Sequence, residues 1–210
     1  MKQTKRIGRF HVITDTLLQT CHSHVELAAL AIAGGADTIQ LREKGASTKK
    51  MIRAAEEMQA LCKAAGVIFI VNDRVDVAIA SGADGVHLGQ DDFPIPLARE
   101  LLGEKAIIGG SAGNIEEARK CLTEGADYIG FGPVYATASK MDAGPTGGLD
   151  LLRHVAEEIP LPIVAIGGIT TGNAPLVMKA GAHGIAVISA VCCQTDPTEA
   201  ARSLLLCIRD

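Results

Sequence analysis

The stretches GADTIQL (35–41), GADGVHL (82–88), GADYIGF (125–131) and GAHGIAV (181–187) repeat one pattern along the chain. In each of them a glycine stands where a helical segment should end, and an apolar run with strand-forming residues follows directly. Successive repeats begin 47, 43 and 56 residues apart, which is about two strand-and-helix units each. The repeats therefore predict four equivalent strands, each preceded by a helix.

Four further strand-like runs lie before and between the repeats, at 9–14, 67–71, 106–110 and 162–166. Strands that alternate with helices must pair in parallel, because each helix carries the chain back across the sheet. The alternating helical patterns fall at 23–33, 48–65, 75–81, 94–102, 114–124, 148–158, 171–180 and 197–208.

Eight such units in 210 residues, with the repeat on every even strand, favour a closed barrel over an open sheet. A doubly wound sheet usually carries a G-x-G-x-x-G turn after its first strand, and TDTLLQT at 14–20 contains no glycine. We therefore expect an α/β fold, a single (β/α)8 TIM-barrel domain over residues 1–210. The repeats alone can reflect a shared packing demand and carry no chemistry.

The composition argues against several function classes. The net charge of −4 gives no electrostatic reason to bind nucleic acid or an anionic membrane, and no apolar run approaches the length of a membrane span. The six cysteines include no C-x-x-C pair, which favours reduced thiols in the cytoplasm over a metal or redox site. We expect small molecules as partners, and the sequence leaves homo-oligomer formation open.

Polar side chains gather at the carboxyl ends of the predicted strands, where barrels of this class carry their chemistry. The second strand ends in TIQLREK (38–44). Alternation puts Gln40, Arg42 and Lys44 on the side that rises into the mouth of the barrel. Glu43 points away from the mouth, toward a structural ion pair.

Two carboxylates face the same mouth, because Asp73 follows the third strand and Asp92 lies just past the fourth. Mg²⁺ favours one or two carboxylates, with phosphate oxygens and water completing its shell. The structural alternative makes Asp73 a helix cap and Asp92 part of a solvated turn, and spacing alone does not decide between the two. We expect His87, within the fourth strand, to be a hydrogen-bonded barrel residue rather than a ligand.

Fixed positive charge on the rim comes from Arg42, Lys44 and Lys140, the last in the loop after the sixth strand. One alternative is that these cations merely neutralise the nearby carboxylates. Together with Asn72 and Ser111 they fit a metal-chelated pyrophosphate better, because the metal and the cations would share the negative charge of a departing diphosphate.

A second phosphate-binding region is predicted on the same rim. Gly167 and Gly168 follow the seventh strand and Ser189 follows the eighth, where such barrels commonly bind a phosphate monoester. Glycine lets the backbone approach an anion, and the following helix presents N–H groups to it. Two such regions predict two phosphorylated substrates.

Five segments carry a resemblance to a known family: QLREK (40–44), VNDRVDVAIASGADGVHLGQDD (71–92), ADYIGFGPVYATASK (126–140), PIVAIGGIT (162–170) and AGAHGIAVISA (180–190). Together, and in this order over essentially the whole chain, they resemble the thiamine-phosphate synthase family. The resemblance implies an enzyme that joins hydroxymethylpyrimidine diphosphate to thiazole phosphate with Mg²⁺, giving thiamine phosphate and pyrophosphate.

The resemblance also implies a role for each matching residue. Asp73 and Asp92 would be the metal ligands. The residues implied to hold the pyrimidine diphosphate are Gln40, Arg42, Lys44, Asn72, Ser111 and Lys140, of which Arg42, Lys44, Ser111 and Lys140 would act in catalysis. Those implied to border the thiazole phosphate are Thr137, Ser139, Gly168, Ile188 and Ser189.

Two departures from the family pattern bear on the alternatives. Ser139 stands where the family's T-x-T-K loop has its second threonine, so a hydroxyl is kept with altered packing. The segment 112–114 lacks the histidine with which a related group tautomerises the thiazole. The missing histidine and the complete charged set favour the synthase over a thiazole tautomerase-like isomerase. A non-catalytic regulator that binds phosphorylated metabolites is the other alternative.

Overall fold

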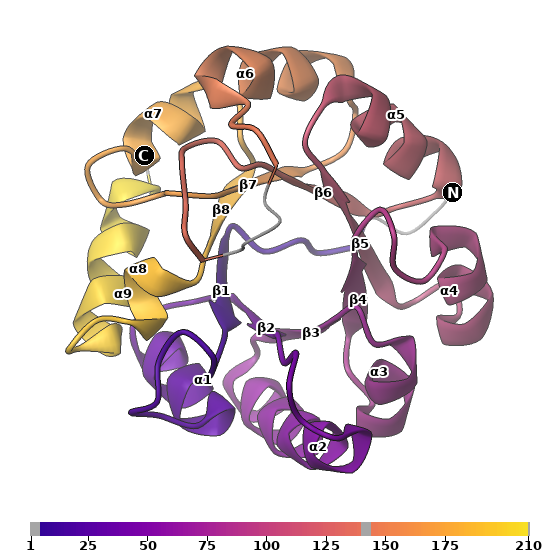
Figure 1. The fold of residues 1–210 in the computed structure, drawn as a ribbon, viewed down its shortest axis with the longest axis vertical. Helices are drawn as coiled ribbons and strands as arrows, with labels where there is room; N and C mark the ends of the chain where they lie inside the picture. The colour runs from indigo at the N-terminus through magenta and orange to yellow at the C-terminus, as the bar shows by residue number, and fades with distance from the viewer. Residues whose placement is uncertain (1–4, 140–143, 210) are drawn as a thin grey trace.

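The computed structural model describes residues 5–139 and 144–209. Its strands are β1 (Phe10–Thr14), β2 (Thr38–Leu41), β3 (Ile68–Asn72), β4 (Gly85–Leu88), β5 (Ile107–Ala112), β6 (Tyr128–Phe131), β7 (Ile163–Ile166) and β8 (Gly184–Val187). All eight pair in parallel in chain order, and β8 closes the ring against β1 (Figure 1). The prediction of a closed (β/α)8 barrel is confirmed.

The helices surround the barrel on its outside (Figure 1). They are α1 (His24–Ala33), α2 (Thr48–Ala65), α3 (Val75–Ser81), α4 (Ile95–Leu102), α5 (Ile115–Glu124), α6 (Gly148–Glu158), α7 (Ala174–Lys179), α8 (Ser189–Cys192) and α9 (Pro197–Cys207). The single turn α8 was not anticipated. α7 is shorter than predicted, because the residues before it form a turn in which the Thr170 amide donates to the Asn173 side chain.

In the described part of the chain, no helix is both long and apolar enough to cross a membrane.

The aspartates of the GAD repeats fasten neighbouring strands at the amino end of the barrel. Asp37 accepts the amide protons of Arg9 and Phe10, at 2.8 and 3.0 Å. Asp84 accepts from the amide of Phe69 at 2.9 Å, and Asp127 accepts from that of Ile108 at 2.8 Å. Each carboxylate thus satisfies a donor at the start of the preceding strand, which would otherwise lack a partner. The repeat has a structural cause, at the opposite end of the barrel from the predicted chemistry.

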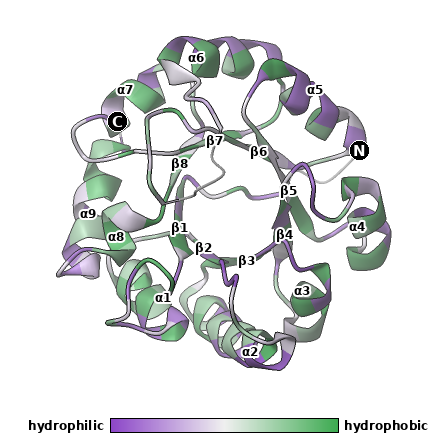
Figure 2. Cartoon of the chain, viewed as in Figure 1, coloured by the Kyte–Doolittle hydropathy of each residue, from purple (hydrophilic) through white to green (hydrophobic). Residues whose placement is uncertain are grey.

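The alternation predicted for β2 is confirmed by burial. Ile39 and Leu41 are fully buried in the cluster that joins the sheet to the helices, while Gln40 lines the cavity inside the barrel. Burying one such aliphatic side chain contributes about 1.5–3 kcal/mol. Figure 2 shows both hydrophobic and hydrophilic residues along the helices of the outer ring, as expected for helices with one buried and one exposed face.

Candidate active site

One cavity of about 630 Å³ opens at the carboxyl ends of the strands. Twelve of the thirteen predicted site residues line it, while Lys140 lies outside the described residues. The twelve are Gln40, Arg42, Lys44, Asn72, Asp73, Asp92, Ser111, Thr137, Ser139, Gly168, Ile188 and Ser189.

The charged wall of this cavity begins at the end of β2. The guanidinium of Arg42 forms an ion pair with Asp15. The backbone amide of Arg42 donates to the Thr14 carbonyl at 3.1 Å. Asp15 is 1% exposed and also accepts from the amide of Leu17. A guanidinium has five N–H donors, so the pair with Asp15 orients Arg42 and leaves donors for a ligand.

The ammonium of Lys44, also at the end of β2, forms an ion pair with the carboxylate of Asp73. Burial raises the pKa of Asp73, the neighbouring Asp92 carboxylate raises it further, and the Lys44 ammonium opposes both effects. Among the described non-glycine residues, Asp73 is the one with a positive φ, 63°. A left-handed residue of this kind costs about 1–2 kcal/mol and persists where the surrounding structure enforces it. This carboxylate lines the cavity beside Lys44.

Asp92 approaches Asp73 from the loop after β4. Its carboxylate accepts from the amide of Gly89 at 2.7 Å, which shapes the turn that carries it. The described residues contain no group of three or more His, Cys, Asp or Glu that could hold a metal. Two hard oxygen donors at the mouth of an open cavity nevertheless suit Mg²⁺, which takes its remaining ligands from water and phosphate.

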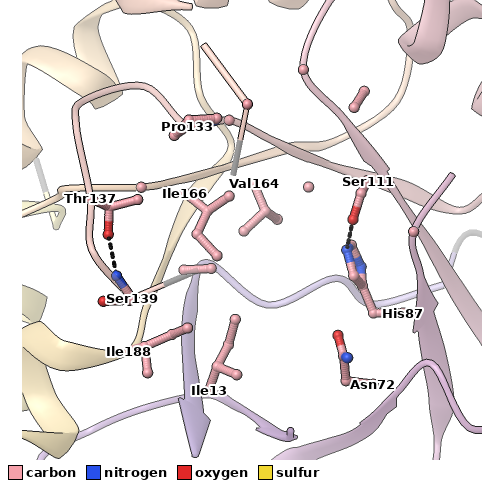
Figure 3. A pocket seen from close by; sticks show the side chains of 18 of the residues that line it. Ile13, Asn72, His87, Ser111, Pro133, Thr137, Ser139, Val164, Ile166 and Ile188 are labelled. Atoms are coloured by element: carbon pink, nitrogen blue, oxygen red, sulfur yellow. Dashed lines mark hydrogen bonds between the residues drawn. The ribbon is translucent and has the colours of Figure 1, made fainter. Parts of the chain in front are cut away.

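His87 is hydrogen-bonded inside the barrel, as expected. Its Nε2 lies 2.9 Å from the Ser111 hydroxyl, and its Nδ1 lies 3.0 Å from the hydroxyl of buried Tyr128. Room for these rings comes from glycine, since a Cβ at Gly109 or Gly130 would overlap the His87 ring. Figure 3 shows Ser111 and His87 joined on one side of the cavity, with Asn72 beside them.

The opposite side of the cavity carries hydroxyl groups. The Ser139 hydroxyl donates to that of Ser189 at 2.9 Å, and its amide donates to the Thr137 hydroxyl at 3.2 Å. Ile188 lies beside them in Figure 3. Gly168 has φ 62°, and a Cβ there would meet the Ala136 carbonyl, so packing against the β6–α6 loop requires glycine whether or not an anion binds.

Apolar side chains separate the two sides. Ile13, Val164 and Ile166 stand between them in Figure 3 and line the cavity. Two ligands bound on the two sides would thus meet over an apolar surface.

Sequence reasoning missed several residues around the cavity. Asp15 directly follows β1, so the rule that placed the other rim residues could also have found it. The buried floor residues His11 and Tyr128 lie within strands and carry no such signal. Asn114, in the segment that lacks the histidine, caps α5 by accepting from the Glu117 amide at 2.9 Å.

Comparison with known proteins places the chain in a family. Residues 10–191 match the sequence model of the family described as thiamine monophosphate synthase. The chain belongs to this family. The thiamine-phosphate synthase of Methanocella arvoryzae is 56% identical over 92% of both chains, and that of Chloroflexus aurantiacus is 53% identical over 93% of this chain and 90% of its own. As a member of this family the chain is an enzyme, a transferase of thiamine biosynthesis.

Solved structures agree with this membership. A thiamine phosphate pyrophosphorylase from Pyrococcus furiosus superimposes with a TM-score of 0.88 at 42% identity, over 95% of each chain. A 3-hexulose-6-phosphate synthase superimposes with a TM-score of 0.69 at 22% identity, over 95% of this chain and 99% of its own, and that likeness concerns the fold alone.

Proposed function

We propose that this member of the family joins hydroxymethylpyrimidine diphosphate to thiazole phosphate, releasing pyrophosphate and forming thiamine phosphate. The observation that carries the proposal is the division of one cavity into a charged side and a hydroxyl side, with apolar side chains between them. The charged side, with Arg42 and Lys44, suits a diphosphate. The hydroxyl side, with Ser139 and Ser189, suits the single phosphate of the second substrate.

In the proposed reaction the bond between the pyrimidine methylene carbon and the diphosphate oxygen breaks, and its electron pair leaves with the diphosphate. Arg42 and Lys44 stabilise the charge that builds on this leaving group, with Lys140 as the third cation expected from the sequence. The thiazole nitrogen then donates its lone pair to the methylene carbon. No enzyme nucleophile is needed, because the thiazole itself supplies the electrons of the new bond.

Asp73 and Asp92 would hold Mg²⁺ in this proposal. When bound, the metal neutralises part of the negative charge of the diphosphate. In this proposal the contact between Lys44 and Asp73 keeps a cation for the diphosphate next to a carboxylate for its metal.

The apolar surface between the two sides has its own role. A cationic pyrimidine intermediate would react with water, so Ile13, Val164 and Ile166 protect it by displacing solvent. Holding the thiazole nitrogen close to the methylene carbon makes the bond-forming step effectively unimolecular.

The test is to incubate the protein with both substrates and Mg²⁺ and to measure pyrophosphate and thiamine phosphate. Release of both in equal amounts is the expected result. Conversion of the thiazole substrate alone would favour the isomerase, and binding without pyrophosphate release would favour a regulator. A cytoplasmic location and the absence of nucleic-acid and membrane partners belong to the same proposal.

A further inference from the structure

A line of polar side chains leads from the cavity wall down into the barrel. It runs from the Ser111 hydroxyl to His87 and on to the hydroxyl of Tyr128, at 2.9 and 3.0 Å. Tyr128 is 1% exposed, and the His11 ring tilts against it with 5.5 Å between the ring centroids. The line thus connects a wall residue of the candidate site to the buried floor of the barrel.

The protons on this line can be assigned from the donors and acceptors present. Tyr128 has a buried O–H donor, and His87 Nδ1 is the acceptor within reach of it. A buried donor without an acceptor costs about 1–3 kcal/mol, so Tyr128 donates and Nδ1 accepts. A neutral imidazole that accepts at one nitrogen carries its proton on the other. His87 Nε2 therefore donates to the Ser111 oxygen, and the Ser111 proton is left for a ligand.

The reverse direction leaves a donor unused. If Ser111 donated to Nε2 and Nδ1–H donated to Tyr128, the phenol proton would have to find another acceptor in the barrel floor. Among the described residues, the Tyr128 hydroxyl has no hydrogen-bond acceptor other than His87. The two glycines at 109 and 130, which make space for the rings, show that the line is built into the barrel.

We propose that Tyr128 and His87 are positioning residues that make Ser111 a hydrogen-bond donor toward the pyrimidine diphosphate. The identity of this ligand rests on the proposed function, whereas the direction of the protons does not. The substrate atom that faces Ser111 is accordingly an acceptor, and a substrate that offers an N–H there is rejected.

Nitrogen-15 NMR of the protein labelled at histidine tests the proton direction, because protonated and unprotonated ring nitrogens have distinct chemical shifts. The expected state near neutral pH is His87 with the proton on Nε2 and a bare Nδ1. The signal is assigned as the one lost in His87→Gln. His11 serves as an internal reference, since its Nε2 must donate to the Gly8 carbonyl at 3.0 Å. A proton on Nδ1 of His87, alone or together with one on Nε2, overturns the proposal.

Steady-state kinetics of Tyr128→Phe tests the positioning role. The variant keeps the ring and loses the donor, so KM for the pyrimidine diphosphate should rise about tenfold, as for one misdirected hydrogen bond. KM for the thiazole phosphate should stay within about twofold, because its predicted site lies on the other side of the cavity. An unchanged KM for both substrates, or an equal rise in both, contradicts the proposal.

The chain contains a matched control in its other tyrosine. The Tyr135 hydroxyl is buried without a hydrogen-bond partner among the described residues. Tyr135→Phe therefore makes the same chemical change without breaking a hydrogen bond, and both KM values should stay unchanged. If wild-type protein releases no pyrophosphate from the two substrates, the proposed function fails, while the NMR result still decides the proton direction.

Discussion

The Glu43 carboxylate lies 3.2 Å from the His24 imidazole, so the loop after β2 is joined to the first turn of α1. The other oxygen of Glu43 accepts from the amides of Gly45 and Ala46, at 2.6 and 3.0 Å. Glu43 therefore fixes the backbone directly after Lys44. The structural partner expected for Glu43 is therefore the His24 imidazole, and this contact supports the inward-facing charges of the same strand end.

Glu43→Gln should lower the free energy of unfolding by about 1–2 kcal/mol, because charged hydrogen bonds to His24 and two amides are weakened in a largely buried place. A loss of this size moves the melting temperature down by several degrees. The measurement is thermal unfolding near neutral pH. The control is Glu158→Gln, which breaks a solvent-screened surface pair with Arg119 and should lower the melting temperature much less. Equal shifts in the two variants would contradict the role of Glu43.

The same carboxylate predicts a pH dependence of stability. Burial would raise the pKa of Glu43, yet the Gly45 amide, His24 and the Ala46 amide together hold that pKa below its usual value of 4.5. A group whose pKa is lowered by folding stabilises the protein above its unfolded pKa and loses this contribution as the pH falls through the folded pKa. The stability difference between wild type and Glu43→Gln should be full above about pH 6 and shrink on acidification below about pH 5. A difference that stays constant down to pH 3 would exclude this linkage.

Asp92→Asn should reduce turnover by at least about a hundredfold at saturating Mg²⁺, because it removes a charge partner of the proposed metal. The Mg²⁺ concentration for half-maximal rate should also rise. The control is Asp76→Asn on α3, an exposed residue paired with Arg74. Near-wild-type turnover in Asp92→Asn would refute the metal role.

Lys140→Ala should lose activity to a similar extent.

Arg42→Ala should weaken binding of the pyrimidine diphosphate and of inorganic pyrophosphate by at least about tenfold, as expected for a lost charged hydrogen bond. Titration calorimetry with pyrophosphate and Mg²⁺ measures this directly, and Arg119→Ala is the surface control. Because Asp15 would then be buried without its partner, the melting temperature should fall as well. Unchanged pyrophosphate affinity would remove Arg42 from the site.

Ser139→Ala should raise KM for the thiazole phosphate by about three- to tenfold through the loss of one phosphate hydrogen bond, with KM for the pyrimidine diphosphate unchanged. Ser139→Thr, which restores the hydroxyl pattern common in the family, is the conservative partner and should keep KM close to wild type. A rise in both constants in Ser139→Ala would point to a collapsed loop instead of a phosphate contact.

The barrel and its rim were predictable because both follow local rules. Glycine and alternation mark strand ends, and parallel strands bring their carboxyl ends to one edge, so Asp73 and Ser111 could be placed together without a structure. The partners of the charges were not equally accessible. Asp15 meets Arg42 across 27 residues because Thr14 and Leu41, the residues just before them, are paired in β1 and β2, and the strand-end rule could have found this contact. His24 meets Glu43 across 19 residues, and that contact depends on how α1 packs on the barrel. The proton direction along Tyr128 and His87 likewise needs atomic distances.

The carboxylates of Asp37, Asp84 and Asp127 hold strand starts at the end of the barrel remote from the cavity. Substitutions should therefore be tolerated at the carboxyl end of the barrel, around the cavity, and poorly tolerated at its amino end. A library randomised at rim positions such as Thr137 and Ser189 should yield mostly folded proteins with altered ligand preference. A library randomised at the three aspartates should yield mostly unfolded ones. The chemistry of such a barrel can then diverge while its architecture persists.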